Sequence, residues 1–207
     1  MRLRLMRILG ASVLAVTSIA AAERNVEIAP SLGFRSGASL DSTTAGVASA
    51  EADAALSWGL SVGWKVRPDG WLEVLFDHQT LEFTQSGGTD PHRFDVGVDY
   101  LQIGGGYEPP REGMRPYVTV AVGLGWFGSD PGSVSESTGL SGSIGGGFKV
   151  PVGKKVLFRL EARAWAMLTS GALAVDCGPG CRFSLSGEGF WQFGVRAAVA
   201  FCPSGTR

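Results

Sequence analysis

The sequence has few of the side chains that bind nucleic acid or coordinate metals. Of its 207 residues only 18% are charged, two are histidines and three are cysteines. Lysine and arginine number 18 against 19 acidic residues, and they form no basic patch, which argues against a nucleic-acid partner. A structural zinc site needs four ligands, and no histidine lies near the paired cysteines. We therefore expect neither a metal nor a cofactor.

Long apolar runs are also missing after the N-terminal segment. Arg2, Arg4 and Arg7 precede the apolar run ILGASVLAV and a small-residue stretch, which predicts a signal peptide at 1–22 that is cleaved before Glu23. Without these three arginines, 15 basic residues face 19 acidic ones, a net charge of −4. No later run reaches the ~20 apolar residues of a spanning helix, which excludes an α-helical membrane protein.

Glycine, in contrast, is abundant. The chain has 31 glycines, about 15% of its length against a usual ~7%. A hydrophobic content of 44% and 10% aromatic residues are too high for a disordered chain. Glycine suits crowded or bent strands in small closed barrels, because backbone and large side chains approach closely there.

Alternation of apolar and polar residues predicts eight strands. They cover 25–35, 55–66, 71–83, 94–107, 116–127, 139–150, 159–168 and 190–201. Pro30 requires a bulge or a locally unpaired position in the first strand. In the fourth strand the phase changes near Asp99, which indicates either a bulge or a misplaced boundary.

The connections between these strands alternate in length. Those at 67–70, 108–115 and 151–155 are short, whereas those at 36–51, 84–93, 128–138 and 169–184 are long. Short turns at one end and long loops at the other are the pattern of an outer-membrane barrel with both termini in the periplasm. A soluble ligand-binding barrel of the lipocalin kind is the competing interpretation, and it requires a mainly apolar interior.

The segment RLEARAWAML at 159–168 bears on that choice. Arg159, Glu161 and Arg163 share one face, and alanine and leucine take the other. In a membrane barrel the charges face the interior and the apolar side chains face lipid. An eight-stranded interior has just enough room for side chains, and isolated buried charges are costly, so we expect a salt-bridged, closed lumen. The predicted lumen charges are Lys65, Glu73, Asp77, Lys149, Arg159, Glu161, Arg163, Glu188 and Arg196.

The tryptophans predict the two membrane interfaces. Trp64 and Trp71 flank the first short turn. The other four fall toward the opposite ends of their strands: Trp58, Trp126, Trp165 and Trp191. Aromatic girdles occupy such positions in membrane barrels, although tryptophan is also common in soluble cores.

Four segments carry a family resemblance: LEVLFDHQT (72–80), DYLQIGGGY (99–107), RPYVTVAVGLG (115–125) and FWQFGVRAAVAF (190–201). They resemble the small eight-stranded outer-membrane β-barrels of Gram-negative bacteria. The resemblance implies an all-β, antiparallel, up-and-down transmembrane barrel over 23–201. It also implies outer-membrane lipids, lipopolysaccharide and the outer-membrane assembly machinery as partners. That machinery reads a terminal aromatic residue, a role that Phe201 matches, although a short extension (202–207) follows it.

The cysteines and the polar loops suggest features outside the membrane. Cys177 and Cys181 in CGPGC lie in the last long loop, where an oxidising envelope favours a disulfide. Cys202 is left over, as a free thiol or a partner of another chain. The loops are rich in Ser, Thr, Gly and Asp, which is compatible with a host or surface ligand and equally with a purely structural role.

His78 is the one candidate for catalysis. Some eight-stranded outer-membrane barrels remove an acyl chain from lipid A with a histidine, a serine and an acidic group near the surface rim. Such chemistry needs a hydroxyl within hydrogen-bond reach of His78 and a carboxylate that orients its ring. The sequence offers Asp77 beside it, with Ser141 or Ser143 as the hydroxyl. A histidine on a barrel strand is more often a rim or lumen residue, so a hydrolase is the alternative and a non-enzymatic barrel the first hypothesis.

Overall fold

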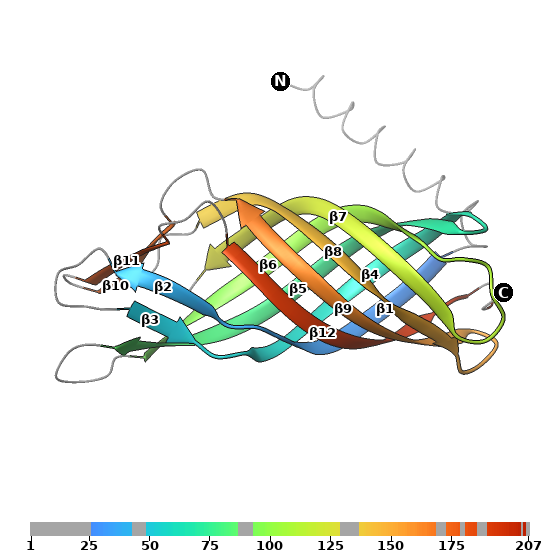
Figure 1. The fold of residues 1–207 in the computed structure, drawn as a ribbon, viewed down its shortest axis with the longest axis horizontal. Coiled ribbons are helices and arrows are strands. Elements are labelled where there is room, and N and C mark those ends of the chain that lie inside the picture. The colour runs from blue at the N-terminus through green and yellow to red at the C-terminus, as the bar shows by residue number, and fades with distance from the viewer. Residues whose placement is uncertain are drawn as a thin grey trace, which may run out of the picture.

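The computed structural model describes residues 26–42, 49–86, 93–128, 137–168, 173–178, 181–185, 190–203 and 205. Eight antiparallel strands form a closed cylinder (Figure 1). They are β1 (Val26–Arg35), β4 (Ala55–Arg67), β5 (Gly70–Ser86), β6 (Arg93–Tyr107), β7 (Arg115–Gly128), β8 (Ser137–Pro151), β9 (Val156–Leu168) and β12 (Phe190–Phe201). Each pairs with its neighbour in this series, and β12 pairs with β1 to close the ring. No helix in the described part of the chain is long and apolar enough to cross a membrane.

The connections are sorted by length between the two ends of the cylinder. At the short-turn end, 68–69, 108–114 and 152–155 join consecutive strands. At the long-loop end the sheet continues as two further hairpins (Figure 1). They consist of β2 (Ala38–Ser42) with β3 (Ser49–Ala52), and β10 (Leu173–Gly178) with β11 (Cys181–Leu185). The sequence predicted loops here, because these short segments lack the strict apolar alternation that marks a strand with one buried face.

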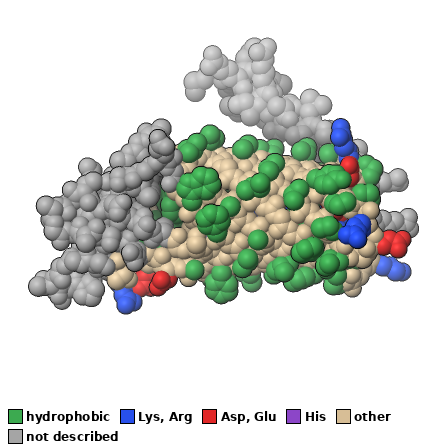
Figure 2. Space-filling model, viewed as in Figure 1, with side chains coloured by type: hydrophobic (Ala, Val, Ile, Leu, Met, Phe, Trp, Pro, Cys, Tyr) green, Lys and Arg blue, Asp and Glu red, His purple; other side chains and the backbone are tan. Residues whose placement is uncertain are grey.

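Burial alternates along each strand, as a barrel wall requires. On β7, Val118, Val120 and Val122 are exposed, whereas Tyr117 and Thr119 are buried. The same inversion holds around the ring: large apolar side chains are exposed on every strand of the cylinder, whereas charged side chains such as Glu73, Glu161 and Arg163 are buried. Figure 2 shows hydrophobic side chains along the flank of the barrel and charged ones near its two ends. The outer surface is therefore an apolar belt, and the interior is polar.

The seam between β1 and β12 contains an interruption at Pro30. Their register pairs Ile28 with Phe201 and resumes at Ser31 with Ala198. Proline has no backbone N–H and cannot donate to the ladder. On its other side Pro30 keeps its place in the register, opposite Leu60 of β4. The sequence expectation of a locally unpaired position is thus confirmed, and β1 runs through it without ending.

Strand β6 contains no bulge near Asp99, so that one of the two explanations offered by the sequence for the change of phase is wrong. Its register with β5 is unbroken from Gly70 opposite Tyr107 to Thr84 opposite Arg93. Val96 and Val98 face the interior, whereas Leu101 faces outward. The apolar phase changes because the lining of the interior becomes apolar toward the long-loop end, and the strand itself stays regular.

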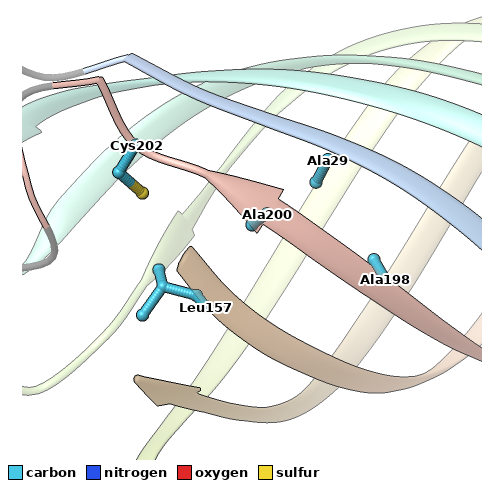
Figure 3. Packing of buried hydrophobic residues seen from close by; sticks show 5 residues of the cluster. All are labelled: Ala29, Leu157, Ala198, Ala200 and Cys202. Atoms are coloured by element: carbon cyan, nitrogen blue, oxygen red, sulfur yellow. The ribbon is translucent and has the colours of Figure 1, made fainter. Parts of the chain in front are cut away.

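A small apolar cluster fills the interior at the short-turn end. It consists of Ala29, Leu157, Ala198, Ala200 and Cys202 (Figure 3). Cys202 follows the last strand, and its backbone N–H donates to the carbonyl of Lys155 at 2.8 Å. Its thiol is free, and burial raises its pKa from 9.0 to about 11. The residue after Phe201 thus folds back into the mouth of the barrel, which disfavours a disulfide to another chain.

Candidate functional site

Glu161 on β9 is the centre of the charged interior. Arg163 Nε lies 2.6 Å and Arg196 Nη2 2.6 Å from its Oε1. Arg159 approaches Oε2, which also accepts a hydrogen bond of 2.6 Å from the Tyr117 hydroxyl. Both carboxylate oxygens are thus shared by charged donors, an arrangement that a buried carboxylate needs. Alternation along β9 places Arg159, Glu161 and Arg163 on one face, which is why they meet.

Glu73 on β5 binds two of these arginines, Arg159 and Arg163, from the opposite wall. Its carboxylate lies 2.9 Å from Arg163 Nη2 and 3.3 Å from Arg159 Nη2. Thr119 of β7 donates a hydrogen bond of 2.8 Å to it. The two carboxylates therefore hold two guanidinium groups between them, and the network connects walls of the cylinder that are distant in sequence.

Arg35 at the end of β1 is fully buried and forms the part of the network nearest the long-loop end. Its Nη1 lies 2.6 Å from Asp77 Oδ1, and its Nε donates to Gln79 Oε1 at 2.8 Å. Its guanidinium carbon lies 5.0 Å from the ring centre of Tyr100 and 5.3 Å from that of Trp165. Arginine suits this place, because its flat group can stack and donate in a fixed fork.

A second charged group lies near the short-turn end. Lys149 Nζ is 2.8 Å from Glu27 and 3.2 Å from Glu108, which also binds Arg115 at 2.9 Å. The ammonium lies 4.2 Å from the ring centre of Trp71, within cation–π distance. This group lies in the interior between the pair Glu73 and Arg159 and the short-turn end.

The interior becomes apolar at the long-loop end. We call this layer the apolar cap; it consists of Leu81, Phe83, Val96, Val98, Phe127, Met167 and Phe190, all buried. The rings of Phe127 and Phe190 meet edge to face with their centres 5.0 Å apart. We call the ion-paired side chains around Glu161, Glu73 and Asp77 the charged layer. Its member Arg35 borders the cap, since its Nη2 donates to the carbonyl of Val98 at 3.2 Å and its guanidinium lies against Tyr100 and Trp165.

The charged side chains of the described interior are almost inaccessible to water. The space among Arg159, Glu161, Arg196 and the serines Ser31 and Ser61 has no room for a water molecule. Counted over both charged groups, six cations face five carboxylates. They are Arg35, Arg115, Lys149, Arg159, Arg163 and Arg196, with Glu27, Glu73, Asp77, Glu108 and Glu161. The near balance of sign lets so many charges share a narrow space.

Seven of the nine predicted lumen charges belong to these groups: Glu73, Asp77, Lys149, Arg159, Glu161, Arg163 and Arg196. Lys65 is half-buried and makes no ion pair with a described residue. Glu188 lies outside the described residues. The set of lumen charges predicted from the sequence lacked four members of these ion-pair groups, namely Glu27, Arg35, Glu108 and Arg115. Glu27 and Arg35 share the polar face of β1, a signal that could have identified them, whereas Glu108 and Arg115 border a turn.

Two tryptophans lie elsewhere than the girdle prediction placed them. Trp71 and Trp165 are buried in the interior, where they contact Lys149 and Arg35. Trp58 and Trp191 are exposed on the outer surface. An aromatic residue near a strand end can face lipid or the interior, and its odd or even position along the strand decides which. Trp165 shares the interior face with Arg163, not the outer face with Ala164.

His78 faces outward at the middle of β5 (Gly70–Ser86), not at its surface end as the sequence suggested. Its Nδ1 lies 2.7 Å from Asp99 Oδ1 on β6, and its Nε2 lies 3.3 Å from the Thr80 hydroxyl. Ser141 and Ser143, which the sequence offered as the hydroxyl, face the interior and bind Gln102, so the barrel wall separates them from His78. Asp77 is likewise inside; the acid beside the ring is Asp99.

Cys177 and Cys181 belong to the β10–β11 hairpin, in which Gly178 lies opposite Cys181. Their side chains lie outside the described part of the structure, so the disulfide stays a prediction. Within the described residues, no group of three or more His, Cys, Asp or Glu side chains could hold a metal ion.

Several solved structures are similar to this chain. Neisserial surface protein A matches with a TM-score of 0.57 and 16% identity, covering 86% of this chain and 96% of that one. The outer membrane protein OprG from Pseudomonas aeruginosa matches with a TM-score of 0.55 and 15% identity, covering 86% and 97%. The chain has the fold of the small eight-stranded outer-membrane barrels. No family model matches it, and no curated protein does.

Proposed function

We propose that the protein is an integral outer-membrane β-barrel whose lumen is closed, with a structural or surface-interaction role. The inversion of polarity carries this proposal. The outer face exposes side chains such as Val122, Ile144 and Phe193 to their surroundings, and the ion pairs of Glu161 lie inside. Water would penalise this exposed belt, whereas lipid solvates it.

The closed lumen argues against a channel. Positively and negatively charged side chains form ion pairs in the middle of the cylinder, and the apolar cap covers them toward the long-loop end. A surface role would belong to the hairpins β2–β3 and β10–β11, which extend the sheet past the barrel. We propose a host or surface ligand for that extension, and lipopolysaccharide and other outer-membrane lipids around the belt.

The sequence features at the ends of the chain complete the proposal. Residues 1–22 act as a cleaved signal peptide, residues 23–201 form the barrel, and 202–207 are a short extension. Phe201 ends β12 and serves as the aromatic that the assembly machinery reads. Cys177 and Cys181 form a disulfide at the tip of the β10–β11 hairpin.

Fractionation of a Gram-negative host that expresses the chain tests the location. We expect the protein in the outer-membrane fraction and faster gel migration without boiling than after it, since a folded barrel resists detergent. Reconstituted in a planar bilayer, it should give no steady ion current. Recovery in the soluble periplasm would refute the membrane assignment, and a steady current would refute the closed lumen.

A lipid-ester hydrolase is the second candidate, favoured by the hydrogen-bonded series Asp99, His78 and Thr80. In the proposed step His78 Nε2 takes the hydroxyl proton of Thr80, whose oxygen attacks the ester carbonyl. The carbonyl–alkoxide bond breaks, and the alcohol leaves with that proton. Water then hydrolyses the threonine ester and restores the hydroxyl. The position on the outer face would bring a lipid ester, such as those of lipid A, to Thr80.

Purified, detergent-folded protein incubated with lipid A tests this candidate by mass spectrometry. The hydrolase would be supported if the wild type removes one acyl chain from lipid A. His78→Ala and Thr80→Val should then abolish this loss, and Thr80→Ser should retain it. Thr84→Val on the same strand is the matched control and should leave the rate unchanged. An intact lipid A after prolonged incubation with the wild type would exclude the hydrolase.

A further inference from the structure

The outer surface of the barrel contains a groove of about 640 Å³. Six of its lining residues are Phe34, Ala162, Ala164, Phe193, Gly194 and Val195, from three adjacent strands β1, β12 and β9. Phe34, Phe193 and Val195 are among the most exposed apolar side chains of the belt. The groove is therefore on the face opposite to the charged interior.

The register explains its shape. Phe34 pairs with Val195, which pairs with Ala162, and Phe193 pairs with Ala164. Large side chains on β1 and β12 thus stand beside two small ones on β9. On the neighbouring strand β8, Gly146 lies opposite Ala162 and keeps the surface low there, whereas the exposed Ile144 lies opposite Ala164 and bounds the hollow on that side. The result is an apolar hollow with alanine as its floor and aromatic side chains as its wall.

The chemistry of the lining restricts the occupant. Arg35 and Arg163 also border the groove, but their guanidinium groups bind Asp77 and Glu161 inside the barrel. Among the described lining residues no charged group is left to bind a polar ligand, and the groove is continuous with the apolar belt. An occupant at this place must itself be apolar.

Its form favours a flexible chain over a second barrel. A stable protein interface buries about 800 Å² on each partner with close complementarity. A rigid barrel of the same convex shape would meet the prominent Phe34 and Phe193 before it reached the alanine floor. A hydrocarbon chain is narrow and adapts to the hollow.

We propose that this groove holds one acyl chain of a membrane lipid. Ser36 and Ala54 border it at the long-loop end, so the lipid headgroup lies there, beyond the belt. The inference rests on the proposed membrane location. Both phospholipids and lipid A supply such chains, and the test separates them.

Native mass spectrometry of the detergent-folded protein, titrated with either phosphatidylethanolamine or lipid A, measures the bound lipid. Ala164→Phe fills the groove, and Val120→Phe makes a larger side chain at an exposed site of β7 away from it. We expect the wild type and Val120→Phe to retain one lipid and Ala164→Phe to bind it at least tenfold more weakly. If Ala164→Phe does not fold, Ala162→Leu replaces it. The lipid that the wild type retains identifies the source of the chain.

Equal retention by the wild type and both variants would overturn the inference, because it would show unspecific lipid around the belt. A wild-type dimer that Ala164→Phe dissociates would overturn it as well, in favour of a second copy. The mobility shift on boiling is recorded for each sample. Its absence in the wild type would refute the membrane barrel itself, whereas a normal shift without bound lipid refutes only the groove.

Discussion

Two layers of the barrel interior are closed by different physics. In the charged layer, long side chains from β1, β5, β9 and β12 meet across the axis and share carboxylates. In the apolar cap, side chains such as Leu81, Val98 and Phe127 pack without any charge. The charged layer depends on every partner, because removing one leaves a buried ion without a counter-ion. The cap loses stability in proportion to the volume removed.

The sharpest contrast is expected from Glu161→Gln. Arg159, Arg163 and Arg196 would then share too few carboxylates, and the free energy of unfolding should fall by about 3–5 kcal/mol. Urea unfolding in detergent or lipid vesicles measures it. The control Glu82→Gln breaks an exposed pair with Arg93 and should cost less than about 1 kcal/mol. Equal losses in the two variants would contradict the special status of the charged layer.

Within the cap, Leu81→Ala should lower the free energy of unfolding by about 3 kcal/mol, since the side chain is fully buried and leaves a cavity. Leu140→Ala on the lipid-facing side should cost less, because lipid refills the space. Leu81→Ala should still give no steady current through a planar bilayer, because the charged layer stays intact. A steady current from Leu81→Ala would show instead that the cap is the main barrier.

Arg35→Lys tests the junction between the two layers. Lysine keeps the charge for Asp77 but loses the fork that also binds Gln79 and the stacking between Tyr100 and Trp165. We expect a loss of about 2 kcal/mol in the free energy of unfolding. Arg93→Lys on the surface is the matched control and should be neutral. No difference between the two would mean that the junction needs only a positive charge.

The smallest effect concerns Cys202. Its pKa is raised to about 11, so the folded state holds the thiol proton more tightly than the unfolded state. The associated stability is present below about pH 9 and is lost as the pH rises through 11. At pH 8 the thiolate fraction should be about 100-fold lower than in the unfolded chain, a tenfold change per pKa unit. Alkylation rates of folded and urea-unfolded Cys177→Ser/Cys181→Ser protein measure this, and equal rates would show an exposed thiol.

Much of the barrel followed from alternation alone. Eight strands and the sides of Arg159, Glu161 and Arg163 could be predicted, because a strand with period two fixes its faces. The apolar cap could not. Rules for membrane barrels assign apolar residues to lipid, and Val96 and Val98 break that rule inside the lumen.

The partners of the charged layer were only partly predictable. Parity places Arg35 in the interior, but only the register shows that it reaches Asp77 and Gln79 on β5. For His78, the sequence neighbour Asp77 was misleading, since adjacent residues of a strand face opposite sides. Asp99 is 21 positions away and becomes its partner through the β5–β6 register.

The seam between β1 and β12 governs how the cylinder can form. Every other wall contact joins strands that follow one another in the series, whereas this one joins the first strand to the last. Closure must wait until the whole chain is present, and the loop-closure entropy is then largest. Pro30 leaves a gap in the ladder at that place. The seam is therefore the expected last step of folding and the first line along which the wall would open.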